Sequence, residues 1–415
     1  MRRDLDRLMR ERGLAGMVVF AYDRYSQAMH YVTGQKLHYG VYLRAPGDVE
    51  GDPPRAHLIH DPMERDQAAA VGCDHSGFPQ HALPRILIEE GGHPARAFGR
   101  LIGESCATLA IGGRIGLFGD LPAGFAHALV LRMTEANPAL TVDTGHPDLM
   151  LQARATKDPD EVEAIRRAAR GTVAAMGRLR YFLSSLRRDG EHFHADGAGP
   201  VKLGDLRRVL HREFLEHGLA EDQGDSIVSQ GRDAGVPHNR GDDDEPLTAG
   251  RSLIVDIFPG EAGGGYHSDM TRTFCMGPAP APLKEIHAQT HAAFSAAKAA
   301  LTAGRPCRSF QDVACDIYER HGHATRRTNE ATQEGYVHNL GHGVGLSVHD
   351  QPLLGGPPTN TVILEPGMVV TVEPGLYYPE RGMGCRIEDL VYIRPDGSVE
   401  VLTPFPCDLE IEPRG

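Results

Sequence analysis

Acidic side chains inside or at the ends of apolar runs are the first residues in this sequence that could do chemistry. Asp256 lies within the run 252–258, and Glu373 directly follows the run 368–372. A carboxylate in an apolar strand costs free energy unless it is paired or bound to a metal ion. These positions are therefore candidates for metal binding or for acid–base work.

Two further acids extend the pattern. Asp269 opens a strand-like segment, and Glu388 leads into another apolar run. The prolines and glycines between residues 259 and 265 favour a hairpin loop. We therefore expect the strand around Asp256 to pair with the segment around Asp269 and to bring the two aspartates opposite each other. The two-residue period of a strand places Asp269 on the same face as Thr271.

A glycine-rich segment, residues 338–350, supplies histidines. His338 and His342 have the i, i+4 spacing of helical zinc peptidases, but the residue after His338 is Asn rather than Glu. The glycines of this segment also disfavour a helix. The segment is therefore predicted to present its histidines, including His349, from a strand or loop.

In chain order, these residues resemble the pita-bread metallopeptidases, the superfamily of methionine aminopeptidase, aminopeptidase P and Xaa-Pro dipeptidase. The motifs Ser-Asp-Met-Thr-Arg-Thr-Phe, Gly-His-Gly-Val-Gly, Val-Glu-Pro-Gly and Arg-Ile-Glu-Asp carry the resemblance. The resemblance implies five metal ligands, which are Asp256, Asp269, His342, Glu373 and Glu388. It also implies catalytic roles for His238, His338, His349 and Glu373, and substrate contacts for His238 and His349.

The resemblance implies two divalent metal ions in this set of ligands. Four carboxylates repel one another, and two doubly charged cations would balance them. Oxygen-rich ligands with one imidazole suit Mn²⁺, with Zn²⁺, Co²⁺ and Fe²⁺ as alternatives. The expected reaction is attack of an activated water on a scissile carbonyl, with Glu373 passing the proton to the leaving nitrogen and His238 and His349 stabilising the carbonyl oxygen.

The chain of 415 residues is expected to form two domains. Residues 1–153 alternate helix-like and strand-like segments, including a strand-like segment at 85–89, and predict a small α/β domain similar in layout to the creatinase-type N-terminal domain. A helix start signal at Asp158 and the following proline marks the boundary. Residues 154–415 are expected to form one α+β catalytic domain of the pita-bread type. Its predicted helices cover residues 159–185, 203–217, 282–302 and 310–321.

The N-terminal domain favours the Xaa-Pro branch, because methionine aminopeptidases lack it. The predicted substrate bond is the one before proline in dipeptides or short peptides, which has no amide hydrogen and carries a rigid ring. Arg386, two residues before Glu388, is placed to bind a substrate carboxylate, and an ion pair within its own strand pair is an equal alternative. In one departure from the family, the segment from Asp256 to Asp269 is slightly long and rich in glycine, and it places His267 beside Asp269.

Other functions stay open at this point. An aminopeptidase P would act on longer Xaa-Pro-Xaa peptides, and a creatinase-like or ectoine-hydrolase-like enzyme would act on other amides with the same fold. A catalytically inactive domain would only bind a partner. The complete set of five candidate ligands weighs against creatinase-like enzymes, which need no metal, and against an inactive domain.

Composition and charge narrow the classes of binding partner and the cellular compartment. The chain has 43 basic and 56 acidic residues and a net charge of −13, so it lacks the basic field that nucleic-acid phosphates require. The first apolar run, residues 14–22, is too short to span a membrane. Seven scattered cysteines without a CxxC pair fit a reducing compartment. We therefore expect a cytoplasmic enzyme that binds small peptides, not nucleic acid or membranes, and the resemblance implies a homodimer.

Overall fold

The structure is a computed structural model that describes residues 4–47, 52–195 and 199–414. The chain divides into two compact units, Met1–Arg154 and Ala155–Gly415. The division falls one residue from the boundary expected from the helix start signal. Each unit buries its own apolar side chains.

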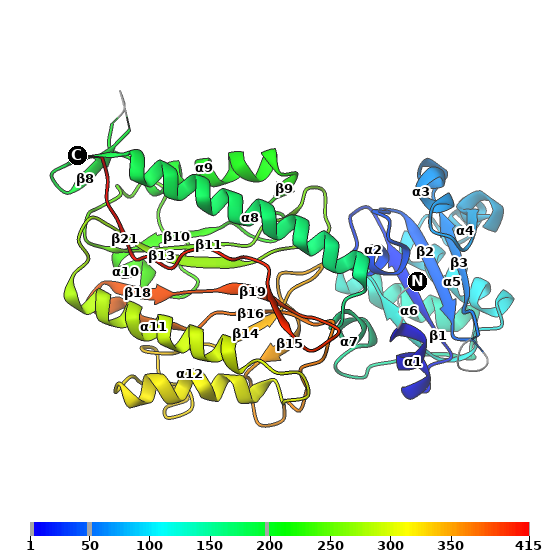
Figure 1. Cartoon of the computed structure of the whole chain (residues 1–415). Helices are drawn as coiled ribbons and strands as arrows, with labels where there is room; N and C mark the ends of the chain where they lie inside the picture. Colours follow the sequence, from blue (N-terminus) through cyan, green and yellow to red (C-terminus); the bar gives the residue numbers. More distant parts are fainter. Residues whose placement is uncertain (1–3, 48–51, 196–198, 415) are drawn as a thin grey trace. The chain divides into compact units, whose positions relative to one another are not determined.

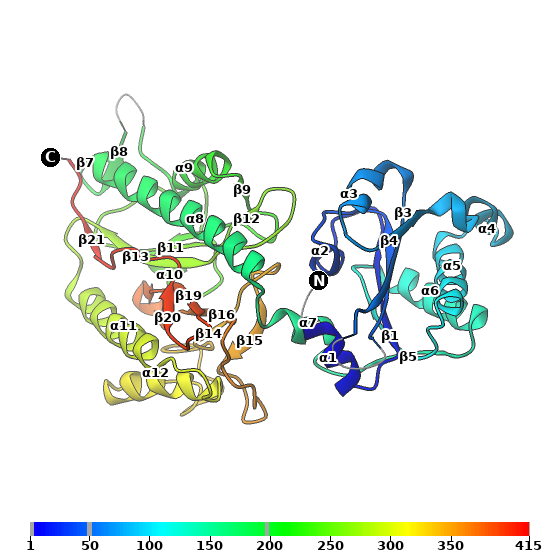
Figure 2. The same ribbon diagram turned by 45° about the vertical axis from the view of Figure 1, so that its right-hand side comes forward.

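The first unit is built on one mixed sheet. Its helices are α1 (Asp4–Glu11), α2 (Gln27–Thr33), α3 (Arg65–Ala69), α4 (Leu83–Glu89), α5 (Pro94–Thr108), α6 (Ala123–Ala136) and α7 (Leu149–Arg154). Its strands are β1 (Gly16–Ala21), β2 (Gly40–Ala45), β3 (Arg55–His60), β4 (Asp74–Gly77), β5 (Gly113–Phe118) and β6 (Leu140–Val142). The strand order is β4-β3-β2-β1-β5-β6, and α5 and α6 pack side by side against it (Figure 2).

One expectation for this unit is wrong. Residues 85–89 are not a strand but part of the helix α4. Pro84 lies in the first turn of this helix, where its fixed φ favours helix initiation and its missing N–H costs no hydrogen bond. Only Ile86 of the helix is buried, so the apolar residues of this run do not show the helical repeat that would have predicted a helix.

The second unit contains two long helix pairs and several sheets. Its helices are α8 (Pro159–Ser185), α9 (Leu203–Glu216), α10 (Gly231–Ala234), α11 (Ala281–Ala300) and α12 (Arg308–Arg320). Its strands are β7 (Arg187–Asp189), β8 (His192–His194), β9 (Leu219–Ala220), β10 (Ile227–Gln230), β11 (Ser252–Ile257), β12 (Gly260–Glu261), β13 (Met270–Met276), β14 (Gly341–Gly343), β15 (Asp350–Leu354), β16 (Val369–Val372), β17 (Gly375–Tyr378), β18 (Met383–Arg386), β19 (Asp389–Ile393), β20 (Val399–Val401) and β21 (Glu410–Ile411). The four predicted helices are confirmed to within two residues at each end.

Two sheets form the centre of this unit, with orders β10-β11-β13-β21 and β15-β14-β16-β19-β20. The helices α8 and α9 cover one side of the strands, and α11 and α12 cover the other (Figure 1). Leu179, Leu210 and Val255 belong to the core under the first helix pair, whereas Phe294 and Val370 belong to the core over the second. The strands are therefore enclosed between two apolar layers.

The register of the predicted hairpin differs from the expectation. β11 and β13 pair antiparallel, but Asp256 lies opposite Thr271 rather than opposite Asp269. Asp269 precedes the first residue of β13. The loop between the strands is long enough to leave Asp269 just outside the ladder, so it approaches Asp256 from the strand end.

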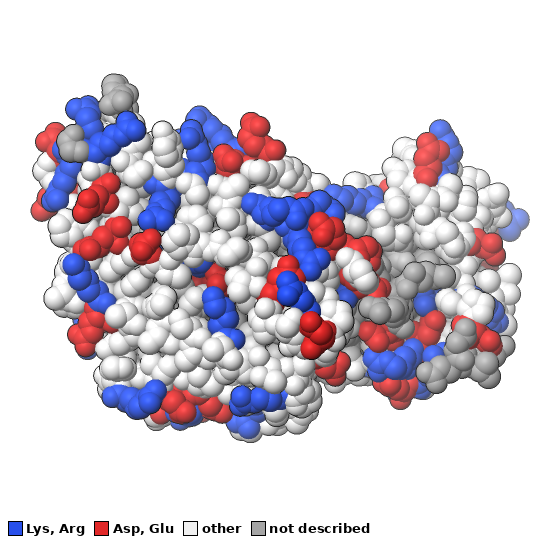
Figure 3. Space-filling model, viewed as in Figure 1, with Lys and Arg blue, Asp and Glu red and all other residues white. Residues whose placement is uncertain are grey.

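Charged side chains of both signs are interspersed on the face drawn in Figure 3. Among the described residues, the helices lack the combination of length and apolar content that is needed to cross a membrane.

Candidate metal centre

The five predicted metal ligands come from five different segments of the second unit. Asp256 belongs to β11, Asp269 precedes β13, and His342 is the middle residue of β14. Glu373 directly follows β16, and Glu388 lies in the short break between β18 and β19. All four carboxylates are shielded from solvent: Asp256, Asp269 and Glu388 are 8 %, 4 % and 2 % exposed, and the side chain of Glu373 is 16 % exposed. The two central sheets thus contribute ligands to one place.

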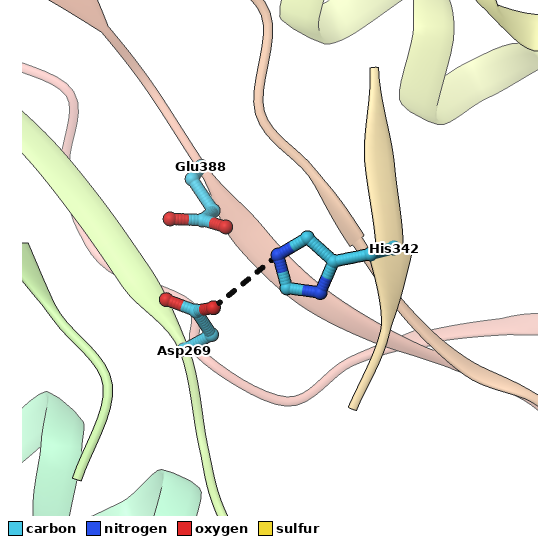
Figure 4. A group of neighbouring side chains, drawn as sticks. All are labelled: Asp269, His342 and Glu388. Carbon is cyan, nitrogen blue, oxygen red and sulfur yellow. Dashed lines mark ion pairs between the residues drawn. The ribbon is translucent and has the colours of Figure 1, made fainter. Parts of the chain in front are cut away.

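Three of these residues form a compact group, which Figure 4 shows. One ligand atom each from Asp269, His342 and Glu388 lies within 4.8 Å of the other two. The Nε2 atom of His342 is 3.7 Å from Oδ2 of Asp269. The carboxylates and the imidazole point toward one another from opposing strands, as ligands around a cation do.

Glu373 and Asp256 complete the arrangement. Oε1 of Glu373 is 3.3 Å from Nε2 of His342, and Oε2 of Glu373 is 3.9 Å from Nδ1 of His338. Asp256 interacts electrostatically with Asp269. The structure therefore brings all five predicted ligands into one buried group.

The glycines on both sides of His342 have a steric function. A Cβ atom on Gly341 would lie 2.1 Å from the carbonyl oxygen of Thr371, and one on Gly343 would lie 2.0 Å from that of Gln351. No side chain can occupy these positions while the strands keep their spacing. The Gly-His-Gly sequence thus lets β14 approach its neighbours closely and carry His342 into the group.

The carboxylates of the group hold protons more tightly than ordinary carboxylates. Burial raises the pKa of Asp269 well above its usual value, and the charges of Glu388, Asp256 and Glu373 add to the effect. The pKa of Glu388 is raised for the same reasons. Burial and Asp256 raise the pKa of Glu373 to about 8, although Arg386 opposes the shift. Without added cations, the group favours protonated carboxyls.

The histidines around the carboxylates are held neutral. Burial, with His349 nearby, lowers the pKa of His342 to about 3, and burial with Arg386 nearby lowers that of His338 to about 3. The rings of His342 and His349 lie 4.4 Å apart between centroids. His238 is exposed and acts electrostatically on both His338 and His349. The structure therefore places all the predicted histidines at this site.

Arg386 lies in the same group but turns toward the protein. Its side chain is only 3 % exposed, and Nη2 donates to Oδ2 of Asp256 at 2.5 Å. Nη1 donates to the hydroxyl of Tyr377 at 2.8 Å and to the carbonyl oxygen of Pro237 at 3.2 Å, and Nε donates to Oγ1 of Thr271 at 3.2 Å. These contacts favour the internal ion pair over the predicted contact with a substrate carboxylate.

Three residues that support the group were not assigned to the site from the sequence. The hydroxyl of Thr271 donates to Glu388 at 2.6 Å, and that of Thr371 donates to Glu373 at 3.3 Å. Each threonine lies two residues from an acid, Asp269 or Glu373, so the strand period could have indicated them. Tyr377, whose hydroxyl also contacts Nε2 of His338 at 2.9 Å, had no such signal.

The donor set fits divalent cations. Oδ1 of Asp256 is buried and has no hydrogen-bond partner among the described residues. Buried polar atoms normally have a partner, so an orphaned oxygen among mutually repelling carboxylates is suited to a cation. The neutral imidazole of His342 offers a nitrogen lone pair to the same group.

Comparison with known protein families decides the membership of this chain. The profile of metallopeptidase family M24 matches residues 163–395, more than half of the chain. The chain belongs to metallopeptidase family M24. The matched range contains all five predicted ligands, and the predicted resemblance to the pita-bread peptidases is confirmed.

Individual relatives agree with this assignment. The probable dipeptidase PepE of Mycobacterium tuberculosis is 29 % identical over 341 residues, which are 77 % of this chain and 83 % of that protein. The Xaa-Pro dipeptidase of Pyrococcus furiosus is 31 % identical over 174 residues, 42 % of this chain and 46 % of that protein. The structure of the Xaa-Pro dipeptidase from Bacillus anthracis is similar over 99 % of both chains, with a TM-score of 0.75 and 24 % identity. This last similarity confirms the predicted pita-bread fold with its smaller N-terminal α/β domain.

Proposed function

We propose that this protein is a dinuclear-metal hydrolase that cleaves the peptide bond before proline in dipeptides or short peptides. The observation that carries the proposal is the buried convergence of Asp269, His342 and Glu388 from separate strands. Membership of family M24 gives this group its chemical context. The substrate class is supported by the names of the relatives, one a probable dipeptidase and one an Xaa-Pro dipeptidase.

The second unit, residues 154–415, is proposed as the catalytic domain and residues 1–153 as a creatinase-type N-terminal domain. We propose that Asp256, Asp269, His342, Glu373 and Glu388 hold two divalent ions, with Mn²⁺ favoured over Zn²⁺, Co²⁺ or Fe²⁺ by the predominance of oxygen donors. Bound there, such ions supply Lewis-acid activation of water and of the peptide carbonyl.

The residues of the chain would supply proton handling and orientation. Glu373 contacts both His342 and His338, so its carboxylate is placed to carry a proton toward the leaving nitrogen. His349 and His238 are exposed beside the buried group. From there their ring nitrogens can donate to the carbonyl oxygen of a bound peptide and to the oxyanion that develops from it.

The dipeptidase assignment does not depend on Arg386. With its nitrogens bonded to Asp256, Tyr377, Thr271 and Pro237, this arginine is assigned to positioning Asp256 instead of binding a proline carboxylate. The preference for dipeptides over longer Xaa-Pro-Xaa peptides therefore rests on the relatives alone. An aminopeptidase P activity is the outcome that the assay below would reveal.

An activity assay with metal-reconstituted protein tests the proposal. We expect hydrolysis of Gly-Pro and slower hydrolysis of Xaa-Pro-Xaa tripeptides, with Mn²⁺ more effective than Zn²⁺. Faster cleavage of the tripeptides would reassign the protein to the aminopeptidase P type. Cleavage of Met-initiated peptides only would overturn the assignment to the Xaa-Pro branch, and no peptidase activity with any of the four metals would favour an amidohydrolase or an inactive binding domain.

The variant Asp269→Asn tests the metal ligands directly. It should lose both bound metal, measured by inductively coupled plasma mass spectrometry, and peptidase activity. A fully active, metal-free Asp269→Asn protein would refute the ligand assignment. A cytoplasmic location and a homodimeric state stay predictions, for which fractionation of cells and light scattering are the measurements.

A further inference from the structure

A tight turn, residues 345–348, precedes His349 and determines where its imidazole lies. Within it, the backbone N–H of Gly345 donates to the carbonyl oxygen of Ser347 at 3.0 Å. His349 is exposed, whereas its neighbours Val348 and Asp350 are buried, so its imidazole projects from a backbone that is held on both sides. The position of the imidazole therefore depends on what holds the turn.

The side chain of Gln223, from a different part of the chain, bonds to this turn at three points. Its Oε1 accepts from the backbone N–H of Val348 and from the hydroxyl of Ser347, both at 3.2 Å. Its Nε2 donates to the carbonyl oxygen of Leu346 at 3.0 Å. The orientation of the amide is fixed by two of these partners, because a flipped amide would place Nε2 against the N–H of Val348 and Oε1 against the carbonyl oxygen of Leu346. One side chain thus satisfies three polar groups of the turn.

His267, two residues before the proposed ligand Asp269, also bonds to this turn. Nε2 of Gln223 lies 2.8 Å from Nε2 of His267, and the backbone N–H of His267 donates to the carbonyl oxygen of Gly345 at 2.8 Å. The other ring nitrogen of His267 lies 3.3 Å from the carbonyl oxygen of Phe258. Nε2 of His267 can accept the second amide hydrogen of Gln223 when the ring proton is on Nδ1, which faces the carbonyl oxygen of Phe258.

The imidazole of His267 packs directly against the backbone of Gly260. A Cβ atom on Gly260 would lie within 2.8 Å of three atoms of that ring. The glycine is therefore required for the ring to reach Gln223. The glycine-rich segment between Asp256 and Asp269 was noted above as a departure from the family. Its Gly260 leaves the space that the imidazole of His267 occupies.

We propose that Gln223 is a positioning residue for His349, and that it acts with His267 by holding the turn at residues 345–348. This inference rests on the proposed function, in which His349 donates to the substrate carbonyl. Catalytic hydrogen bonds depend steeply on placement, so an unrestrained turn lowers the turnover rate more than it lowers substrate affinity.

The variant Gln223→Met tests the proposal, because Met keeps the length of the side chain and removes all its hydrogen bonds. With Gly-Pro and Mn²⁺ we expect kcat to fall about tenfold and KM to change less than about twofold. Bound metal per chain should stay unchanged, since Gln223 contacts no ligand atom. The matched control is Gln67→Met, an exposed glutamine on α3 of the first unit, which should leave kcat and KM unchanged.

A double-mutant cycle separates positioning from a general structural effect. In a His349→Ala background, Gln223→Met should change kcat by less than about twofold, because the group that Gln223 places is already absent. A further tenfold loss in that background would overturn the proposal. So would a loss confined to KM in the single variant.

Hydrogen exchange gives a measurement that does not require peptidase activity. The amide of Val348 should exchange about tenfold faster in Gln223→Met than in the parent or in Gln67→Met, because its acceptor is removed. Unchanged exchange there would overturn the proposal even in an active enzyme. Faster exchange in a protein without Xaa-Pro activity would support the hold of Gln223 on the turn and refute the proposed function, so the two failures are distinguishable.

Discussion

Glu388 and Asp389 are neighbours in the sequence and are both 2 % exposed, yet their surroundings are opposite. Oδ1 of Asp389 is 2.7 Å from Nη2 of Arg272, and Oδ2 is 2.8 Å from Nζ of Lys298. Each oxygen of Asp389 thus has a cation of its own. Glu388 instead accepts a hydrogen bond from Thr271, and burial together with the charges of Glu373 and Asp256 raises its pKa.

The difference shows how a buried structural ion pair can be distinguished from a metal site. A buried acid that is neutralised by basic side chains of the same chain needs no added cation. A buried acid whose neighbours carry the same charge is stable only when protonated or when a cation is added. Because Glu388 lies just before β19 and Asp389 is its first residue, a single step along the chain separates the two situations.

The largest expected effect is on activity at Glu388. Glu388→Gln keeps the shape of the side chain and removes the negative charge, so we expect kcat for Gly-Pro to fall at least ~1,000-fold, or about 4 kcal/mol in transition-state stabilisation, with loss of bound metal. In the metal-free protein the same change should not lower the free energy of unfolding, because the raised pKa of Glu388 favours its neutral, protonated form and the amide is neutral as well. A marked destabilisation without metal would contradict the comparison.

The matching change at Asp389 should act on stability instead. Asp389→Asn leaves the guanidinium of Arg272, which is 1 % exposed, without its charged partner. We expect the free energy of unfolding to fall by about 3 kcal/mol, measured by urea denaturation. Folded Asp389→Asn protein should still bind metal and retain activity. If its main defect were metal loss at unchanged stability, the distinction between the two acids would fail.

The pH dependence of the metal-free protein sharpens the same contrast. The folded-state pKa of Glu373 is about 8 and those of Asp269 and Glu388 are raised above their ordinary values, so above about pH 7 the folded chain binds more protons than the unfolded chain. Below that pH the buried histidines oppose the effect, because the pKa values of His338 and His342 are lowered to about 3 and these rings take up protons only on unfolding. Stability must then fall as pH rises from about 7 to about 8, by up to about 1.4 kcal/mol per pH unit for each extra proton.

Urea denaturation in a chelator at pH 7 and pH 8 measures this effect. The metal-free protein should be the more stable at pH 7. Saturating Mn²⁺ should abolish or reverse the trend, because the ions stabilise the charged carboxylates. A metal-free protein that is more stable at pH 8 would show that these carboxyls are ionised and compensated in some other way.

The smallest expected effect belongs to Lys298. Its side chain is 27 % exposed, and its ammonium also lies 4.2 Å from the ring centroid of Phe294. Lys298→Met removes one of the two cations on Asp389 but leaves Arg272 in place, so we expect a loss of about 1 kcal/mol in the free energy of unfolding. A loss as large as that of Asp389→Asn would mean that Lys298, not Arg272, neutralises the buried acid.

Much of the fold and most of the candidate site could be predicted from local sequence. The capping box in which Asp158 pairs with Glu161 fixes the start of α8. Glu373 could be identified as a candidate ligand from local sequence alone, because it is an acid that directly follows an apolar run. Residues 85–89 could not be assigned in this way, because a short apolar run without a clear period fits either a helix or a strand.

The sequence by itself determined which side chains could bind cations, because residue type and position at a strand end are local properties. Only the tertiary structure decided that Asp256 faces Thr271 across the ladder, that Arg386 bonds to Asp256 from 130 residues away, and that Gln223 bonds to the turn before His349. The physical reason is that strand register and long-range hydrogen bonds depend on how whole layers pack, and no short stretch of the chain contains that information.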